Sequence, residues 1–186
     1  MNRLITMIGA AFVAVTLGAC TTTGYRPGEN AVPGAQPVRD PQIAETIASF
    51  KNKYPALVPY FHDAYGYAVF PTVGKGGFIV AGAYGTGKVY EQGRLVGVSS
   101  ITQATIGLQM GGQTYSEVVF FKDQQALQRF EQGGFELSAQ ASAVAVTSGA
   151  AANASYSNGV AIFTLTKAGL MYEASVGGQE FTFTPI

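Results

Sequence analysis

The chain has 186 residues, of which 12% are charged, and its 11 basic and 11 acidic side chains balance one another. A neutral balance gives no support for non-specific nucleic-acid binding, which depends on neutralising phosphates, and a single cysteine excludes an internal disulfide. The 24 glycines and the 12% of aromatic residues indicate aromatic-rich strands that glycines interrupt, with a sizeable apolar surface.

The first 20 residues have the pattern of a bacterial lipoprotein signal. Arg3 precedes an apolar run over residues 4–15, which is shorter than the roughly 20 residues that a membrane-spanning helix needs. The segment ends in Leu-Gly-Ala-Cys, which resembles a lipobox, where the chain is cut before the cysteine and the cysteine is acylated. We therefore predict a cleaved signal peptide over residues 1–19 and lipidation of Cys20; an ordinary signal peptide with a chance cysteine is the alternative.

Residues 20–39 are expected to form an acylated, flexible tether. They are rich in proline and glycine and show no apolar periodicity, so they cannot bury enough surface to order themselves. Several acyl chains anchor a protein stably because each buried methylene contributes roughly 0.8 kcal/mol. Thr21 follows the cysteine where retention in the inner membrane commonly requires Asp, so we expect an outer-membrane lipoprotein that faces the periplasm or the cell surface.

Residues 40–186 have the size of one domain, and a helix is predicted at its start, over residues 40–54. Asp40 is a good N-cap, and Pro41 suits the first helical position. Pro55 ends the helix because the residue before a proline avoids helical angles. The apolar positions recur at helical spacing and form one stripe: Ile43, Ile47, Phe50 and Tyr54.

Two shorter helices are expected further along the chain. One covers residues 57–65. The other begins after Asp123 as N-cap, carries Leu127 and Phe130 on one face, and ends at Gly133-Gly134.

The remaining segments alternate between apolar and polar residues, which predicts half-buried strands. They are residues 102–110, 115–121, 139–145, 160–166, 170–176 and 181–184, with Gly177-Gly178 expected as a hairpin turn between the last two. The fold class expected is α+β, mostly β: a curved or barrel-like antiparallel sheet with an N-terminal amphipathic helix and one or two further short helices.

A phosphate-binding loop is the first interpretation of residues 82–89, GAYGTGKV. That loop requires Ser or Thr for magnesium where this chain has Val89, and it requires a following helix, whereas residues 88–97 have a strand–turn–strand pattern. We therefore predict no nucleotide. Gly82, Gly85 and Gly87 are better explained as places where a strand bends or another backbone approaches closely.

Catalytic residues are hard to assemble from this sequence. The single histidine, His62, lies beside Asp63, but no nucleophile elbow accompanies them. No cluster of soft metal ligands occurs, and carboxylates such as Glu117 and Glu173 are scattered singly. We predict a non-catalytic protein without metal or cofactor; an enzyme of unfamiliar type would need a pocket that gathers these residues.

Four stretches, in order along almost the whole domain, resemble the SYLF domain family: residues 64–97, 106–121, 127–146 and 169–181. The resemblance implies a bacterial secreted or lipid-anchored protein that binds phospholipids. In eukaryotic members the lipids include phosphoinositides and an N-terminal amphipathic helix takes part, while actin binding belongs to a fungal branch. No established catalytic residues come with the family.

The resemblance makes the helix over residues 40–54 the counterpart of the membrane-active helix. The candidate lipid-binding residues are an apolar residue of its stripe and the basic residues near it or in the glycine-rich stretch: Phe50, Lys51, Lys53, Lys75, Lys88 and Arg94. The alternative is that the stripe packs on the sheet as ordinary core and that the lysines are merely solvated.

The function expected is that of a lipid-anchored envelope lipoprotein whose domain binds phospholipid or a similar amphiphile. The alternative is a structural or interaction lipoprotein, in which the domain binds another envelope protein or the cell wall and the acyl chains alone hold the membrane.

Overall fold

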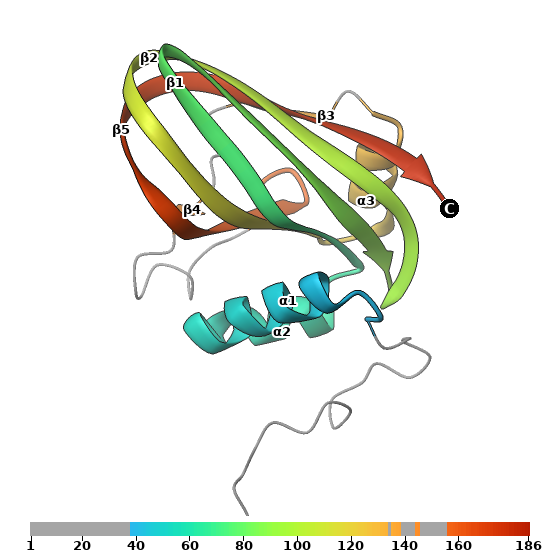
Figure 1. Ribbon diagram of the computed structural model, residues 1–186. Coiled ribbons are helices and arrows are strands. Elements are labelled where there is room, and N and C mark those ends of the chain that lie inside the picture. Colours follow the sequence, from blue (N-terminus) through green and yellow to red (C-terminus); the bar gives the residue numbers. More distant parts are fainter. Residues whose placement is uncertain (1–37, 134, 139–143, 146–155) are drawn as a thin grey trace, which may run out of the picture.

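The computed structural model describes residues 38–133, 135–138, 144–145 and 156–186. Three very long strands curve over the helices in Figure 1. The strands are β1 (Gly66–Glu91), β2 (Arg94–Phe121), β3 (Phe135–Ser138), β4 (Val144–Ala145) and β5 (Val160–Pro185). The helices are α1 (Pro41–Lys53), a 3-10 turn (Pro55–Leu57), α2 (Val58–Asp63) and α3 (Gln124–Glu131).

The strands form one sheet in the order β1-β2-β5-β3, in which all of these neighbours are antiparallel. β4 pairs in parallel with β5 away from that path. The sheet is curved but not closed, since β1 and β3 lie at its two ends. The expected class, mostly β with a curved antiparallel sheet and a few short helices, is therefore confirmed.

The three helices begin and end close to where their local signals place them. The Asp40 side chain accepts hydrogen bonds from the backbone N–H groups of Gln42 and Ile43, and α1 stops before Pro55. Asp123 accepts from the backbone N–H of Ala126 at the start of α3. Among the described residues, no helix is long and apolar enough to cross a membrane.

The predicted hairpin turn at Gly177-Gly178 is wrong. Both glycines lie inside β5, where Gly177 pairs with Thr105 and Gly178 pairs with Ala104. The short strands expected on either side of them are parts of one strand of 26 residues. Glycine pairs suggest turns because they adopt unusual backbone angles, but in this sheet they are accommodated in a strand whose whole length is paired with β2. Residues 139–143 of the predicted alanine strand lie outside the described residues.

β1 bends so sharply that its two halves touch. A Cβ on Gly85 would lie 2.8 Å from the carbonyl oxygen of Thr72, and a Cβ on Gly87 would lie 2.7 Å from the Phe70 ring and meet the carbonyl oxygen of Val69. Real Cβ atoms do not approach other atoms this closely, so only glycine fits at these two positions. The structure thus explains both glycines by close backbone approach.

The hydrophobic core has two clusters, one on each face of the strands. Alternate side chains of β2 enter different clusters, as the period of a strand requires. Val119 and Phe121 pack with α3 residues, whereas Val118 and Phe120 pack with residues of α1 and α2. We call these the α3 core and the α1 core.

Candidate functional site

The apolar stripe of α1 packs against the sheet. Phe50 has no exposed surface, Ile43 is buried, and both belong to the α1 core, with Ile47 and Tyr54 packed against it. The expectation that Phe50 contacts lipid is therefore not supported by its placement. The amphipathic pattern alone could not decide whether the stripe packs on the sheet or binds a membrane, since both kinds of helix have the same apolar spacing.

The lysines expected to bind lipid are engaged in different places. Lys51 Nζ lies 5.0 Å from the centre of the Phe61 ring, and burial lowers the pKa of this lysine. Lys88 Nζ lies 2.8 Å from Asp40 Oδ2, at the other end of α1. A helix of 13 residues is roughly 20 Å long, so these two cations do not share one binding site.

The other two basic candidates also lie apart. Lys75 is buried in β1 opposite Gln113, and Arg94 is exposed at the start of β2, just after the turn that joins the two strands. The structure therefore does not bring the predicted basic residues together into a single cationic surface.

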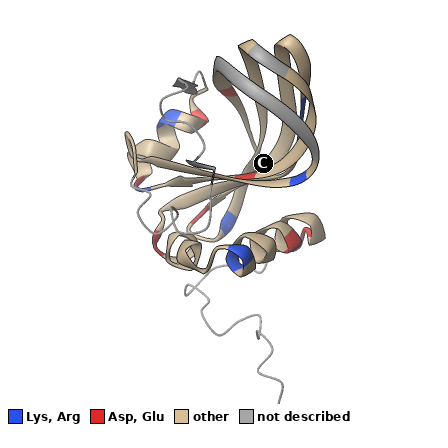
Figure 2. Cartoon of the chain, turned by 90° about the vertical axis from the view of Figure 1, so that its left-hand side faces the viewer, with Lys and Arg blue, Asp and Glu red and all other residues tan. Residues whose placement is uncertain are grey.

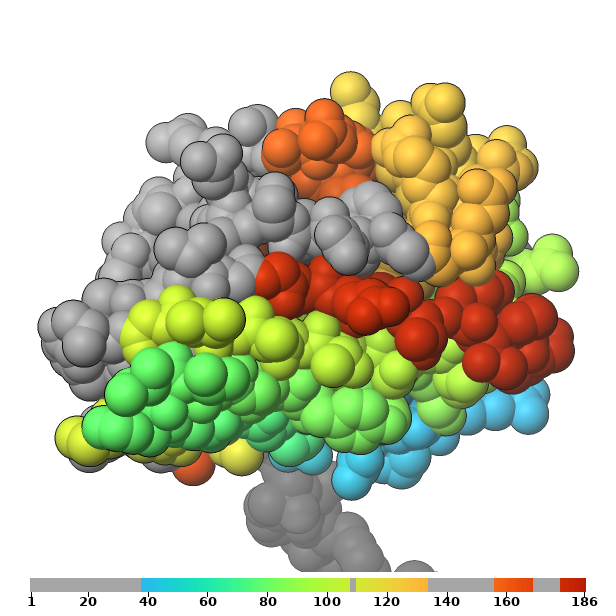
Figure 3. All heavy atoms as spheres, turned by 90° about the horizontal axis from the view of Figure 1, so that it is seen from above, coloured from blue at the N-terminus to red at the C-terminus, as the bar shows by residue number. Residues whose placement is uncertain are grey.

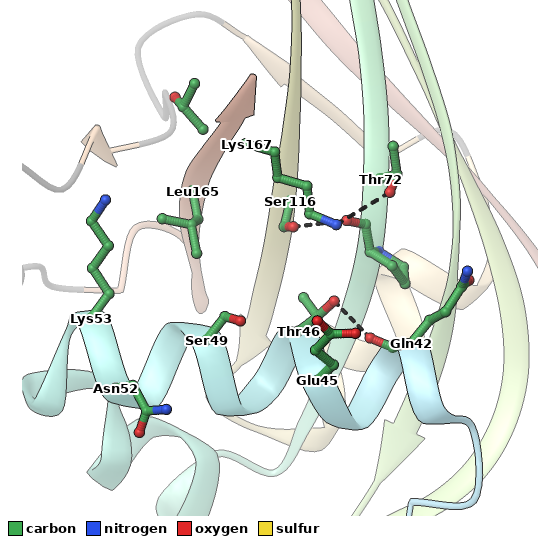
Figure 4. A pocket seen from close by; sticks show the side chains of 12 residues that line it. Gln42, Glu45, Thr46, Ser49, Asn52, Lys53, Thr72, Ser116, Leu165 and Lys167 are labelled. Carbon is green, nitrogen blue, oxygen red and sulfur yellow. Dashed lines mark hydrogen bonds between the residues drawn. The ribbon is translucent and has the colours of Figure 1, made fainter. Parts of the chain in front are cut away.

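Lys53 faces a polar groove of about 650 Å³ between α1 and the sheet (Figure 4). Lys167 of β5 lies in the same groove and donates a hydrogen bond to Thr72 Oγ1 at 3.3 Å. The lining is mostly hydroxyl, amide and charged side chains from α1, β1, β2 and β5: Gln42, Glu45, Thr46, Ser49, Asn52, Lys53, Pro71, Thr72, Ser116, Leu165, Thr166 and Lys167. Glu45 offsets part of the lysines' charge, so the groove suits a hydrophilic group without strong selection for anions.

Glu117 is the one carboxyl among the described residues that is fully buried. Its Oε2 accepts a hydrogen bond from Gln179 Nε2 at 3.1 Å, and its Oε1 has no partner. Burial raises the pKa of Glu117 to about 8, and the hydrogen bond from Gln179 offsets only part of that effect. The side chain is therefore mostly neutral at neutral pH.

The residues considered for catalysis do not meet. His62 Nδ1 lies 2.6 Å from Asp63 Oδ1, and both side chains are exposed on α2. Glu117 points to the face of β2 that carries the α3 core, whereas α2 packs on the opposite face. The side chain of Glu173 lies outside the described part of the structure. The polar groove beside α1 is lined by none of His62, Asp63 and Glu117.

An exposed apolar cluster lies where β1 and β2 bend together. The segments of β1 and β2 run side by side across the face shown in Figure 3. Phe78 pairs with Met110 and Val80 pairs with Ile106. We call this cluster the apolar bend; its members are each between 52% and 67% exposed: Phe78, Ile79, Val80, Ile106 and Met110.

The apolar bend was not predicted from the sequence. Residues 78–81 have the pattern of an ordinary strand and residues 102–110 the pattern of a half-buried one, in which Ile106 and Met110 share an inward face. The structure turns Ile106 and Met110 outward. A signal was nevertheless present, because Phe78, Ile79 and Val80 are three consecutive apolar residues directly after Gly76-Gly77.

Comparison with known proteins finds similarity to one family. A family model described as "Las17-binding protein actin regulator" matches residues 102–184, which extend from β2 to β5. This model represents the SYLF domain family. Residues 102–184 are therefore similar to the SYLF domain family. The resemblance seen in the sequence is thereby confirmed.

A curated relative supports the same assignment. The SYLF-domain protein "Beta cell expansion factor A" of Aeromonas veronii is 28% identical over 133 residues, which cover 70% of this chain and 50% of the relative. The chain thus spans about half the length of that SYLF protein. No solved structure matches the chain.

The residues that match the family model contain most of the paired strands β2 and β5, and with them Ile106, Met110 and Glu117. The α1 helix, the glycine-rich strand β1 and the cations Lys51, Lys53, Lys75 and Lys88 lie before it in the chain. The relative's alignment covers more of the chain than the family model does.

Proposed function

We propose that this protein is a lipid-anchored envelope lipoprotein whose SYLF domain binds phospholipid or a similar amphiphile without catalysing a reaction. Acylated Cys20 would hold the chain at the outer membrane, and residues 21–39 would tether the domain to it. The tether could extend at most on the order of 60 Å, at about 3.3 Å per residue, so the domain can reach the bilayer from several orientations.

The apolar bend is the observation on which this proposal rests. Five large apolar side chains that lie together and are more than half exposed are unusual on a soluble domain, and such patches mark sites of protein or membrane contact. An amphiphile would cover these side chains with hydrocarbon. The polar groove beside Lys53 and Lys167 supplies hydroxyl and ammonium groups that suit a polar headgroup.

Vesicle binding by the purified domain tests the proposal. The fragment from Thr21 onward contains every helix and strand that the structure describes, so it is expected to keep the fold. We expect it to co-sediment with phosphatidylcholine vesicles, with or without added phosphatidylglycerol, well above serum albumin. Native mass spectrometry should detect lipid that co-purifies with the fragment.

The competing function is that of an interaction protein. A reproducible envelope-protein partner in cross-linking, together with vesicle binding no greater than that of albumin, would replace the lipid proposal with this one.

A further inference from the structure

The backbone of the apolar bend is irregular. The pairing of β1 with β2 shifts register between Phe78 and Val80, and Ile79 between them has a φ of 63°. This left-handed conformation is unfavourable for a β-branched residue, and such strain tends to persist at functional sites. In a regular strand one of three successive side chains would point inward, whereas here all three are exposed.

The stretches of β1 and β2 that form the apolar bend contain no charged residue. On β1 there is none between Gly76 and Gly87, and on β2 there is none between Leu95 and Ser116. Figure 2 shows few charged residues on the described upper part of the strands. An uncharged surface does not attract a charged headgroup or a charged protein surface. Its transfer into hydrocarbon carries no free-energy penalty for burying an ion.

Lys75, three residues before Phe78 on β1, is only 8% exposed, and three other lysines have partners of their own. Lys51 stacks on Phe61, Lys88 pairs with Asp40, and Lys167 donates to Thr72. Electrostatic attraction is therefore a small contribution to any contact that the apolar bend makes.

We infer that the apolar bend inserts its side chains among the acyl chains of a bilayer and recognises hydrocarbon rather than headgroup charge. This inference rests on the proposed function, and the bilayer concerned is the one that would hold the acyl chains of Cys20. The insertion is shallow, because β1 is the end strand of the sheet and its outward backbone groups cannot lose their water in the hydrocarbon region.

A tryptophan reporter tests the site of contact. The chain contains no tryptophan, so Phe78→Trp in the fragment from Thr21 onward gives a single emission signal. With phosphatidylcholine vesicles we expect a blue shift and quenching by lipids brominated near the headgroup end of the acyl chain. Val98→Trp is the matched control, because Val98 is 41% exposed on β2 but lies eight residues from Ile106, and its emission should not change.

Salt separates hydrocarbon recognition from charge recognition. Between about 0.01 M and 1 M salt the screening length falls from roughly 30 Å to roughly 3 Å. Binding to neutral vesicles should stay nearly constant over this range, and adding phosphatidylglycerol should not strengthen it by more than about twofold. Salt-abolished binding, or binding that requires phosphatidylglycerol, overturns the inference.

Ile106→Asp tests the contribution of the apolar bend itself, with Val98→Asp as its control. Loss of one inserted side chain should weaken vesicle partitioning roughly tenfold or more, while Val98→Asp should bind like the wild type. Circular dichroism melting checks that both variants fold. If Ile106→Asp folds and binds vesicles as the wild type does, the inference is wrong although the proposed function stands.

Two further outcomes are distinguishable from these. If the wild-type fragment binds no vesicles at all, the proposed function fails and the inference falls with it. If sedimentation equilibrium shows a wild-type dimer that Ile106→Asp converts to a monomer without changing vesicle binding, a second copy of the chain covers the apolar bend instead, which also overturns the inference.

Discussion

The carboxyl of Glu117 lies on the face of the sheet that carries the α3 core. Its hydrogen bond with Gln179 depends on the curvature of the sheet. Gln179 pairs with Gln103, which lies fourteen residues (117 − 103) from Glu117 along β2. In a straight strand these positions would be roughly 46 Å apart. The hydrogen bond between Glu117 and Gln179 therefore joins two parts of the sheet that only its curvature brings together.

Removing the ionisable group of Glu117 should alter the pH dependence of stability. The folded pKa of Glu117, about 8, lies above the ordinary glutamate pKa of 4.5 that applies in the unfolded chain. Between these values the unfolded chain releases a proton that the folded protein keeps, so the free energy of unfolding of the wild type falls as pH rises through this window. The fall is at most about 1.4 kcal/mol per pH unit. Glu117→Gln has no ionisable group at this position, so its free energy of unfolding should not fall through this pH window. At pH 8 the variant should therefore be more stable than the wild type.

Urea unfolding between pH 4.5 and 8.5 measures this difference. Glu180→Gln is the control, since Glu180 lies exposed on β5, and its profile should run parallel to that of the wild type. Parallel profiles for the wild type and Glu117→Gln would contradict the prediction.

The strand β1 shows how glycines with one sequence pattern have different structural roles. Gly87 faces Phe70 and Val69 across the bend, whereas the nearest atom to a Cβ on Gly82 is the carbonyl oxygen of Gln103, at 3.8 Å. Both belong to the stretch that has the spacing of a phosphate-binding loop. In the structure this stretch lies inside β1, which is followed by a two-residue turn and then β2, not by a helix.

Two alanine substitutions compare these glycines directly. Gly87→Ala should destabilise the protein by about 1–3 kcal/mol or more, because its Cβ overlaps backbone and a buried ring. Gly82→Ala should change the free energy of unfolding by less than about 0.5 kcal/mol, as surface substitutions usually do. Urea midpoints measure both. Equal effects would mean that the two halves of β1 do not touch in solution.

The helices were largely predictable from local signals, whereas the lengths of the strands were not. Asp40, Pro55 and Asp123 mark helix ends through contacts within a few residues, so their effect does not depend on the rest of the chain. Gly177-Gly178 has the local signal of a turn, but its pairing with β2 keeps it in a strand. Pairing between segments far apart in sequence overrides such signals.

For the whole molecule, attachment through the acyl chains can be tested separately from lipid contact by the domain. Full-length Cys20→Ser, expressed in a bacterium, should lose palmitate labelling and most of its membrane association because the acyl chains are absent. Labelling and membrane fractionation measure this, with Thr22→Ser as the control. Palmitate incorporation into Cys20→Ser would show that this cysteine is not the lipidation site.

The sequence by itself determined the helix starts, the mostly-β class and the SYLF resemblance, because caps, period-two alternation and ordered motifs are local or additive signals. It did not determine which apolar residues are buried. Phe50 of the α1 stripe lies in the core, while Ile106 and Met110, which alternate like core residues, lie on the surface. The tertiary structure decided this, because the bend at Gly77–Ile79 sets which side of β1 and β2 faces the core.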